Sequence, residues 1–124
     1  MKPRLVPLLA AVAAVACGAA DTPEAQAARG AEVYDRECRH CHDVEGAIGV
    51  ALSGRVIASY GTAPRLFNYL RVAMPYGAPG SRAEGEYWDL VAFLASDRVG
   101  RAVPLLGDTV AAAGVELTGD GESR

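Results

Sequence analysis

One short stretch of this 124-residue chain, Cys38-Arg39-His40-Cys41-His42, constrains its fold more than any other feature. The two thiols are three positions apart, so on one helical turn both can form bonds to one edge of the same flat molecule. His42 follows Cys38 by four positions and lies on the same side of that turn, where its imidazole can reach a metal ion. The stretch therefore predicts a helical turn that packs against a large planar ligand.

The form C-x-x-C-H is the attachment motif of c-type haem. It predicts one covalent haem c, with Cys38 and Cys41 as its thioether ligands and His42 as an axial iron ligand. A zinc site and a thiol–disulfide redox pair are the alternatives. Zinc needs four ligands, and outside the motif the chain has no histidine and only Cys17 as a thiol. A redox C-x-x-C normally follows a strand, whereas residues 24–37 are amphipathic with a helical period, so haem is the favoured ligand.

The second axial ligand is predicted to be Met74, the only methionine besides the initiator. It ends a helical run immediately before Pro75, which cannot readily continue a helix. An isolated methionine is more often a core residue that fills a gap. However, a haem iron with one histidine needs a sixth ligand or an open site, and His40 is held in the attachment turn facing away from the distal side.

The beginning of the chain has the pattern of an export signal. Lys2 and Arg4 precede a charge-free apolar run, Leu5–Ala16, which is shorter than the ~20 residues of a membrane-spanning helix. This pattern predicts that residues 1–17 are a secretory signal peptide. The small residues before Cys17 also resemble a bacterial lipobox, so Cys17 is either a lipidation site that gives a membrane anchor or an incidental thiol. Both alternatives predict a periplasmic location or the extracytoplasmic face of a bacterial membrane.

Composition and charge exclude several classes of protein. With 51% apolar and 22% charged residues, the chain is too apolar for a charge-rich disordered protein, and its length allows one small domain. Loss of residues 1–17 would leave 10 of the 12 basic residues against 15 acidic ones, a net charge of −5. No basic cluster stands out, so nucleic acid is not an expected partner.

The remaining sequence divides into three parts. Residues 18–24 are small and polar like a tether, residues 25–97 have the apolar periodicity of a folded domain, and residues 98–124 form a Gly-rich C-terminal tail. The tail either packs over the domain or extends from it. About 75 residues give a core of marginal stability, which usually needs an additional staple. We expect the covalent cofactor to supply it.

On these residues the chain resembles the class I cytochrome c family. Gly30 and Tyr34 match a glycine and an aromatic residue that precede the first haem cysteine by eight and four positions, and Asp89-Leu90-Val91-Ala92-Phe93-Leu94 matches the family's final helix. The resemblance implies an all-α fold of three to five helices around one covalently attached haem. It also implies that the first and last helices cross where Gly30 and Tyr34 lie. Their implied contacts on the last helix are Leu90 and Phe93.

A narrower resemblance concerns residues 66–81. They are similar to the Met-ligand region of cytochromes that are subunits or partners of molybdenum-dependent sulfite dehydrogenases. A Met-Pro followed by Gly-x-Pro-Gly-Ser also resembles cytochromes that accept electrons from quinoprotein alcohol dehydrogenases. The resemblance thus implies a sulfite or an alcohol dehydrogenase among the redox partners.

Periodicity and cap residues predict three helices, over residues 24–39, over residues 63–73 and from Ser81 through Leu94. Residues 43–61 contain four glycines and are predicted to be a loop on the proximal side of the haem. Trp88 is expected either to pack in the core or to donate a hydrogen bond to a haem propionate. The other residues expected to be buried are Ala25, Ala28, Val33, Tyr34, Leu66, Phe67, Leu70, Tyr87, Leu90, Val91 and Leu94.

Five side chains are further candidates for contact with haem. Leu66 and Leu70 lie on the apolar side of their helix and are expected to pack against the porphyrin. Tyr60, Arg55 and Arg71 are candidates to hold the propionates, because a guanidinium pairs well with carboxylates. For the two arginines, a solvated surface charge is the favoured alternative.

This set of residues predicts an electron carrier that is not an enzyme. An iron held by one histidine and one methionine has no vacant position for a substrate, so single electrons pass between redox protein partners, a donor and an acceptor. A permanent cytochrome subunit of a dehydrogenase complex is one alternative. The other is a haem sensor or peroxidase-like enzyme in which Met74 detaches.

Overall fold

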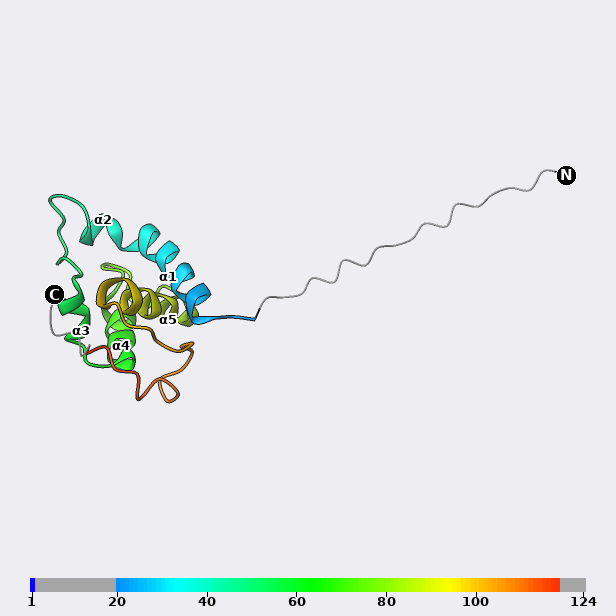
Figure 1. Cartoon of the computed structure of the whole chain (residues 1–124). Helices are drawn as coiled ribbons and strands as arrows, with labels where there is room; N and C mark the ends of the chain where they lie inside the picture. Colours follow the sequence, from blue (N-terminus) through cyan, green and yellow to red (C-terminus); the bar gives the residue numbers. More distant parts are fainter. Residues whose placement is uncertain (2–19, 119–124) are drawn as a thin grey trace.

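The computed structural model describes residue 1 and residues 20–118 (Figure 1). Within these residues the regular elements are helices, and one isolated bridge between Thr62 and Glu116 is the only β-type pairing. The expected all-α fold class is therefore confirmed. The elements are α1 (Pro23–Glu37), α2 (Arg39–His42), α3 (Gly54–Ala58), α4 (Ala63–Ala73), α5 (Glu84–Phe93) and the π-helix η1 (Leu94–Val99).

Apart from Met1, the predicted signal peptide lies outside the described residues, and so does Cys17, the predicted lipidation site. None of the helices in the described part of the chain is both long and apolar enough to cross a bilayer.

Helix α1 begins and ends at positions that the sequence nearly specifies. The Thr22 hydroxyl accepts a hydrogen bond from the Ala25 amide at 3.1 Å, and Pro23 occupies the first turn, where its missing N–H costs nothing. The helix ends at Glu37, two residues earlier than predicted, because the chain changes direction at Cys38 and restarts as α2. The prediction that Ala25 and Ala28 are buried was wrong. Both are exposed, and the buried positions are Gln26, Gly30, Val33 and Tyr34.

Helices α1 and α5 cross in close contact, and α5 lies between α1 and α4 (Figure 1). At the crossing, a Cβ on Gly30 would collide with the Asp89 carbonyl oxygen and would lie 2.7 Å from the Phe93 Cβ. The Tyr34 and Phe93 rings pack with centroids 5.2 Å apart. The implied crossing at Gly30 and the implied contact of Tyr34 with Phe93 are thus present.

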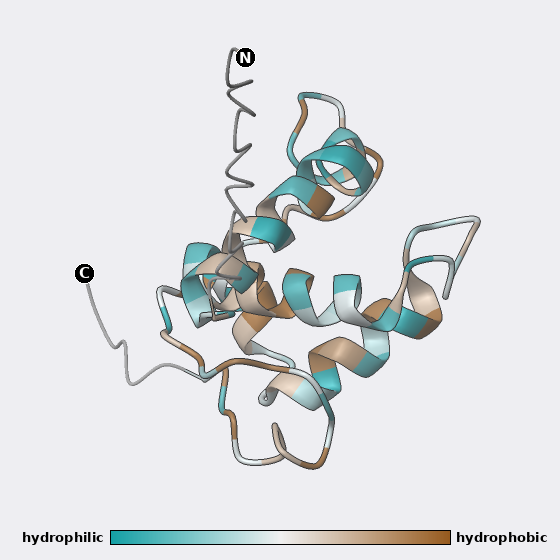
Figure 2. Ribbon diagram, turned by 90° about the vertical axis from the view of Figure 1, so that its right-hand side faces the viewer, coloured by the Kyte–Doolittle hydropathy of each residue, from teal (hydrophilic) through white to brown (hydrophobic). Residues whose placement is uncertain are grey.

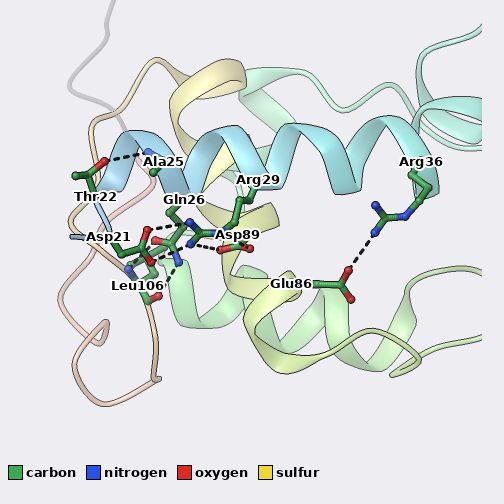
Figure 3. A network of polar contacts seen from close by, with 9 residues as sticks. All are labelled: Asp21, Thr22, Ala25, Gln26, Arg29, Arg36, Glu86, Asp89 and Leu106. Carbon is green, nitrogen blue, oxygen red and sulfur yellow. Dashed lines mark hydrogen bonds and ion pairs between the residues drawn. The ribbon is translucent and has the colours of Figure 1, made fainter. Parts of the chain in front are cut away.

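Polar contacts fix the same pair of helices at the surface (Figure 3). Arg29 on α1 contacts the carboxylate of Asp89 on α5 at 3.1 Å and that of Asp21, before α1, at 2.8 Å. Arg36 on α1 reaches Glu86 on α5 at 3.0 Å. Such half-exposed pairs add modest stability, so the crossing depends mainly on its apolar contact.

Two secondary-structure predictions needed correction. The stretch 43–61 is not entirely loop, because α3 forms within it, with the Ser53 hydroxyl accepting a hydrogen bond from the Val56 amide at 3.3 Å. Ser81 is not the cap of the last helix. That helix begins at Glu84, and the amide of Ala83 donates to the Glu86 carboxylate at 3.1 Å.

The C-terminal segment packs over the domain as far as residue 118. Val103, Leu106, Ala112 and Leu117 are buried (Figure 2 shows brown residues along this segment). The buried amide of Gln26 holds the segment through both backbone groups of Leu106, at 2.8 and 2.7 Å. The Leu117 amide donates to the Gly61 carbonyl at 2.7 Å. These contacts enlarge a core that would otherwise be small.

We expect Gly30→Ala to lower the free energy of unfolding by about 3 kcal/mol, because an added Cβ must push the two helices apart. Urea titration of the purified protein measures this change. Gly85→Ala in α5 is the matched control, since nothing lies within 4 Å of the added Cβ, and it should be neutral or stabilising by up to about 1 kcal/mol. Equal stability of Gly30→Ala and wild type would contradict the close approach.

Candidate haem site

The principal cavity of the domain has a volume of about 730 Å³. Its walls come from the end of α1, from α2, from α3 with the loops on either side of it, from α4 and the loop that follows it, and from α5 and the start of η1. The volume is typical of sites for small organic ligands and cofactors. Seven residues that the sequence analysis proposed as haem ligands or haem contacts line it together: Cys38, Cys41, His42, Tyr60, Leu66, Leu70 and Met74.

The turn that bears the cysteines is closed by its own backbone. The amides of Cys41 and His42 both donate to the Cys38 carbonyl, at 3.1 and 3.2 Å. This turn brings the two sulfur atoms and the imidazole to one cavity, as expected from their spacing. Burial raises the pKa of the Cys38 thiol to about 11, so before any attachment it is protonated at neutral pH.

The imidazole of His42 is held by the loop before α3. Its Nδ1 lies 2.6 Å from the Val50 carbonyl oxygen, so Nδ1 carries the proton and donates it. The other ring nitrogen, Nε2, then has a free lone pair for a metal, and the carbonyl fixes the plane of the ring. Gly49 permits this arrangement, because a Cβ there would lie 2.8 Å from the His42 ring and 2.7 Å from the Cys41 carbonyl oxygen.

The backbone of Met74, the second proposed iron ligand, is held in place by two hydrogen bonds. As the C-cap residue directly after α4, it donates its amide to the Leu70 carbonyl at 2.9 Å. Its own carbonyl accepts a hydrogen bond from the Tyr87 hydroxyl on α5 at 2.8 Å. The side chain packs against the core and lines the cavity. The thioether is therefore available to a ligand that His42 also reaches.

The lining of the cavity is mostly apolar. Its aliphatic side chains come from the loop before α3, from α3, α4 and α5, and from the start of η1, and they include Leu52, Val56, Ile57, Leu66, Leu70, Leu90 and Leu94. Tyr60 and Tyr69 form one polar part of the lining, with ring centroids 5.1 Å apart. Burial, with Tyr69 as a second cause, raises the pKa of Tyr60 to about 12, so both its hydroxyl and its ring are available as neutral contacts.

The structure does not bring Arg55 and Arg71 to the cavity. Both are exposed, and the Arg71 guanidinium lies 5.7 Å from the centroid of the Phe67 ring. The alternative of a solvated surface charge describes them. Trp88 is also absent from the cavity lining. It is buried and stacks on Phe67 with centroids 3.9 Å apart, which favours the packing alternative.

Among the residues of the lining that sequence reasoning missed are Tyr69 and Arg82. Tyr69 follows Leu66 by three positions, so the helical period that identified Leu66 could have included it. Arg82 gave no signal in the sequence. Its Nη1 contacts the Glu37 carboxylate at 3.1 Å, and its buried Nε has no hydrogen-bond partner in the protein.

The donor set fits haem c better than the two alternatives. A zinc site made by the protein alone would need a cluster of His, Cys, Asp or Glu side chains. Residues 20–118 contain no cluster of three or more such side chains that could hold a metal ion. A redox C-x-x-C normally follows a strand. In the described part of the chain, no strand precedes the cysteines. Two sulfur atoms on one turn, a free imidazole nitrogen, a thioether and an apolar cavity match the needs of a covalently bound porphyrin.

Comparison with known proteins agrees with this geometry. A family model described as cytochrome c oxidase, cbb3-type, subunit III matches residues 25–94. All the residues that line the cavity fall within this range. No curated protein and no solved structure matches the chain.

Proposed function

The chain belongs to the c-type cytochrome family described as cytochrome c oxidase, cbb3-type, subunit III, and from this premise we propose that it is an exported carrier of single electrons with one haem. Family membership implies a covalently bound haem c and redox partners. Haem, when bound, supplies a one-electron iron couple. The observation that carries the proposal is that His42 and Met74 line the same apolar cavity as the two cysteines.

Each of these residues has a distinct role in the proposal. Cys38 and Cys41 would form the two thioether bonds. His42 would hold iron through Nε2 while its Nδ1 donates to the Val50 carbonyl, a hydrogen bond that raises the basicity of the ligand. Met74 would hold the iron through its thioether, and a thioether ligand raises the reduction potential relative to a second histidine.

The rest of the cavity suits electron transfer rather than catalysis. With both His42 and Met74 holding the iron, no coordination position would be left for a substrate. The aliphatic lining keeps water away from the site and reduces the reorganisation that accompanies a change of charge. The polar groups of Tyr60, Tyr69 and Arg82 are the candidates for hydrogen bonds to the propionates.

The export signal supports a periplasmic carrier, with Cys17 as a potential lipid anchor. Its donor is proposed to be a sulfite or an alcohol dehydrogenase, the two classes that residues 66–81 resemble. A mature net charge of −5 supports partners with positive docking surfaces.

We expect Met74→Ala to retain covalent haem, to lose the sulfur-to-iron charge-transfer band of the oxidised protein and to have a lower reduction potential. The reduced variant should bind carbon monoxide rapidly at neutral pH, which the wild type should not. Visible spectra and a redox titration measure these changes. Met74→Leu is the matched control for bulk, since it keeps the volume of the side chain and loses only the sulfur.

Two results would separate the functional alternatives at this site. An unchanged spectrum in both Met74 variants would contradict the assignment of this residue as a ligand. Rapid binding of carbon monoxide by the wild type would instead favour the haem sensor or peroxidase-like protein with a labile methionine.

We expect Cys41→Ala and His42→Ala to block maturation, because each removes a bond to the group that completes the core. The measurement is the yield of folded protein and of covalent haem after export. Arg39→Ala, within the same turn, is the control and should mature normally. Soluble, folded protein without haem in the first two variants would contradict the dependence of the fold on its cofactor.

We expect the wild-type protein to purify from its native periplasm as a separate chain. Gel filtration of the native extract, monitored by haem absorbance, gives its mass. Stable co-elution with a dehydrogenase would favour the permanent subunit over the mobile carrier. The identity of such a chain would also decide between the sulfite and alcohol classes.

A further inference from the structure

The residue directly after His42 forms a partly buried ion pair with the end of the last helix. Asp43 ends α2, and its Oδ2 lies 2.6 Å from Nη2 of Arg98. The two side chains are only 21% and 25% exposed. Since exposed ion pairs contribute little and shielded ones contribute more, this pair can affect the geometry of the turn that carries His42.

Arg98 belongs to the π-helix η1, which continues α5 with a wider turn. Such segments are rare, and they occur frequently at functional sites because they change the direction of the side chains that follow. Here the Arg98 guanidinium lies over the ring of Tyr34, 5.0 Å from its centroid. Tyr34 is on α1 and lines the cavity, so the same cation contacts a second wall of the site.

The backbone of Arg98 contacts a third wall. Its carbonyl oxygen packs directly on Gly54, the first residue of α3, where an added Cβ would collide with it. Helix α3 carries Val56 and Ile57, which line the cavity. One residue from outside the cavity thus joins the ends of α1, α2 and α3 around the proposed ligand histidine.

The pair also controls the charge beside that histidine. The Arg98 guanidinium lies in direct contact with the Asp43 carboxylate, so its positive charge offsets the negative charge one residue after His42. Without Arg98, a carboxylate would lie unpaired next to His42. An unpaired negative charge near the iron stabilises the oxidised form.

We propose that Arg98 is a positioning residue for iron ligation, which fixes the turn of His42 through Asp43 and neutralises the carboxylate beside it. This inference rests on the proposed function, since it assumes that His42 binds haem iron. It adds a role for a residue that neither lines the cavity nor belongs to the attachment motif.

The test is a cycle of variants in the mature, haem-loaded protein, with the reduction potential as the readout. Arg98→Gln should lower the potential because it removes the positive charge that offsets Asp43. Asp43→Asn should raise the potential because it removes the negative charge beside His42, while Arg98 keeps its charge and its contact with Asp97 at 3.0 Å. The ratio of reduced to oxidised protein at a fixed solution potential should change by roughly three- to tenfold in each case. The double variant Arg98→Gln/Asp43→Asn should return close to the wild type.

The matched control is the ion pair of Arg29 with Asp21, which joins α1 to the chain before it and whose side chains are 44% and 47% exposed. Asp21→Asn should leave the potential unchanged, because Arg29 keeps its contact with Asp89. A purely structural role for Arg98 would loosen the site in both single variants, and the two potentials would then move in the same direction. Shifts of the same sign, or no shift, would overturn the inference.

A second measurement applies if Arg98→Gln gives too little protein. Arg98→Lys keeps the charge but cannot keep both the contact with Asp43 and the position over Tyr34. Because the charge is kept, we expect the reduction potential of Arg98→Lys to stay close to that of the wild type. We expect the paramagnetic NMR resonances of the haem methyl groups, which report the orientation of the histidine ring, to shift. Unchanged methyl resonances would contradict a positioning role. A wild type without covalent haem would instead refute the proposed function itself.

Discussion

The close approach of α1 and α5 at Gly30 is the contact on which the cavity depends, because α1 ends in the turn of Cys38 and α5 supplies part of the cavity wall through Leu90. A larger residue at the crossing would separate the helices and move the turn away from that wall. The Tyr34 and Phe93 rings extend the contact towards the cysteines. A backbone contact that only glycine permits therefore determines where the reactive side chains lie.

The remaining elements complete the cavity around that crossing. Two backbone carbonyls orient the proposed ligands, that of Val50 for His42 and that of Leu70 for Met74. The C-terminal segment adds buried apolar residues on another side and is held by the amide of Gln26. A chain this small thus combines a peptide core with a large apolar cavity, and membership of a c-type cytochrome family explains the combination, since a covalent haem would complete the core.

Sequence reasoning was most successful where local spacing determines position. The turn Cys38–His42 and helix 63–73 follow from short-range geometry and helix signals, and the structure has both. The reasoning failed where a residue's environment is set by distant segments. Ala25 and Ala28 have the composition of core residues, yet both are exposed among the residues that the structure describes. Arg55 and Arg71 have the right chemistry for propionates, but their helices turn them to solvent.

The sequence by itself determined the chemistry of the site, because two thiols and an imidazole within five residues need no distant partner to come together. It also determined the all-α class, through helical periodicity and the match of both terminal helices to a family pattern. Only the tertiary structure decided which residues surround that chemistry: Tyr69 and Arg82 in the lining, Val50 as the hydrogen-bond acceptor of His42, and Arg98 as the partner of Asp43. These contacts join residues that are 8 to 55 positions apart, and the distance between such residues is fixed by packing and not by spacing along the chain.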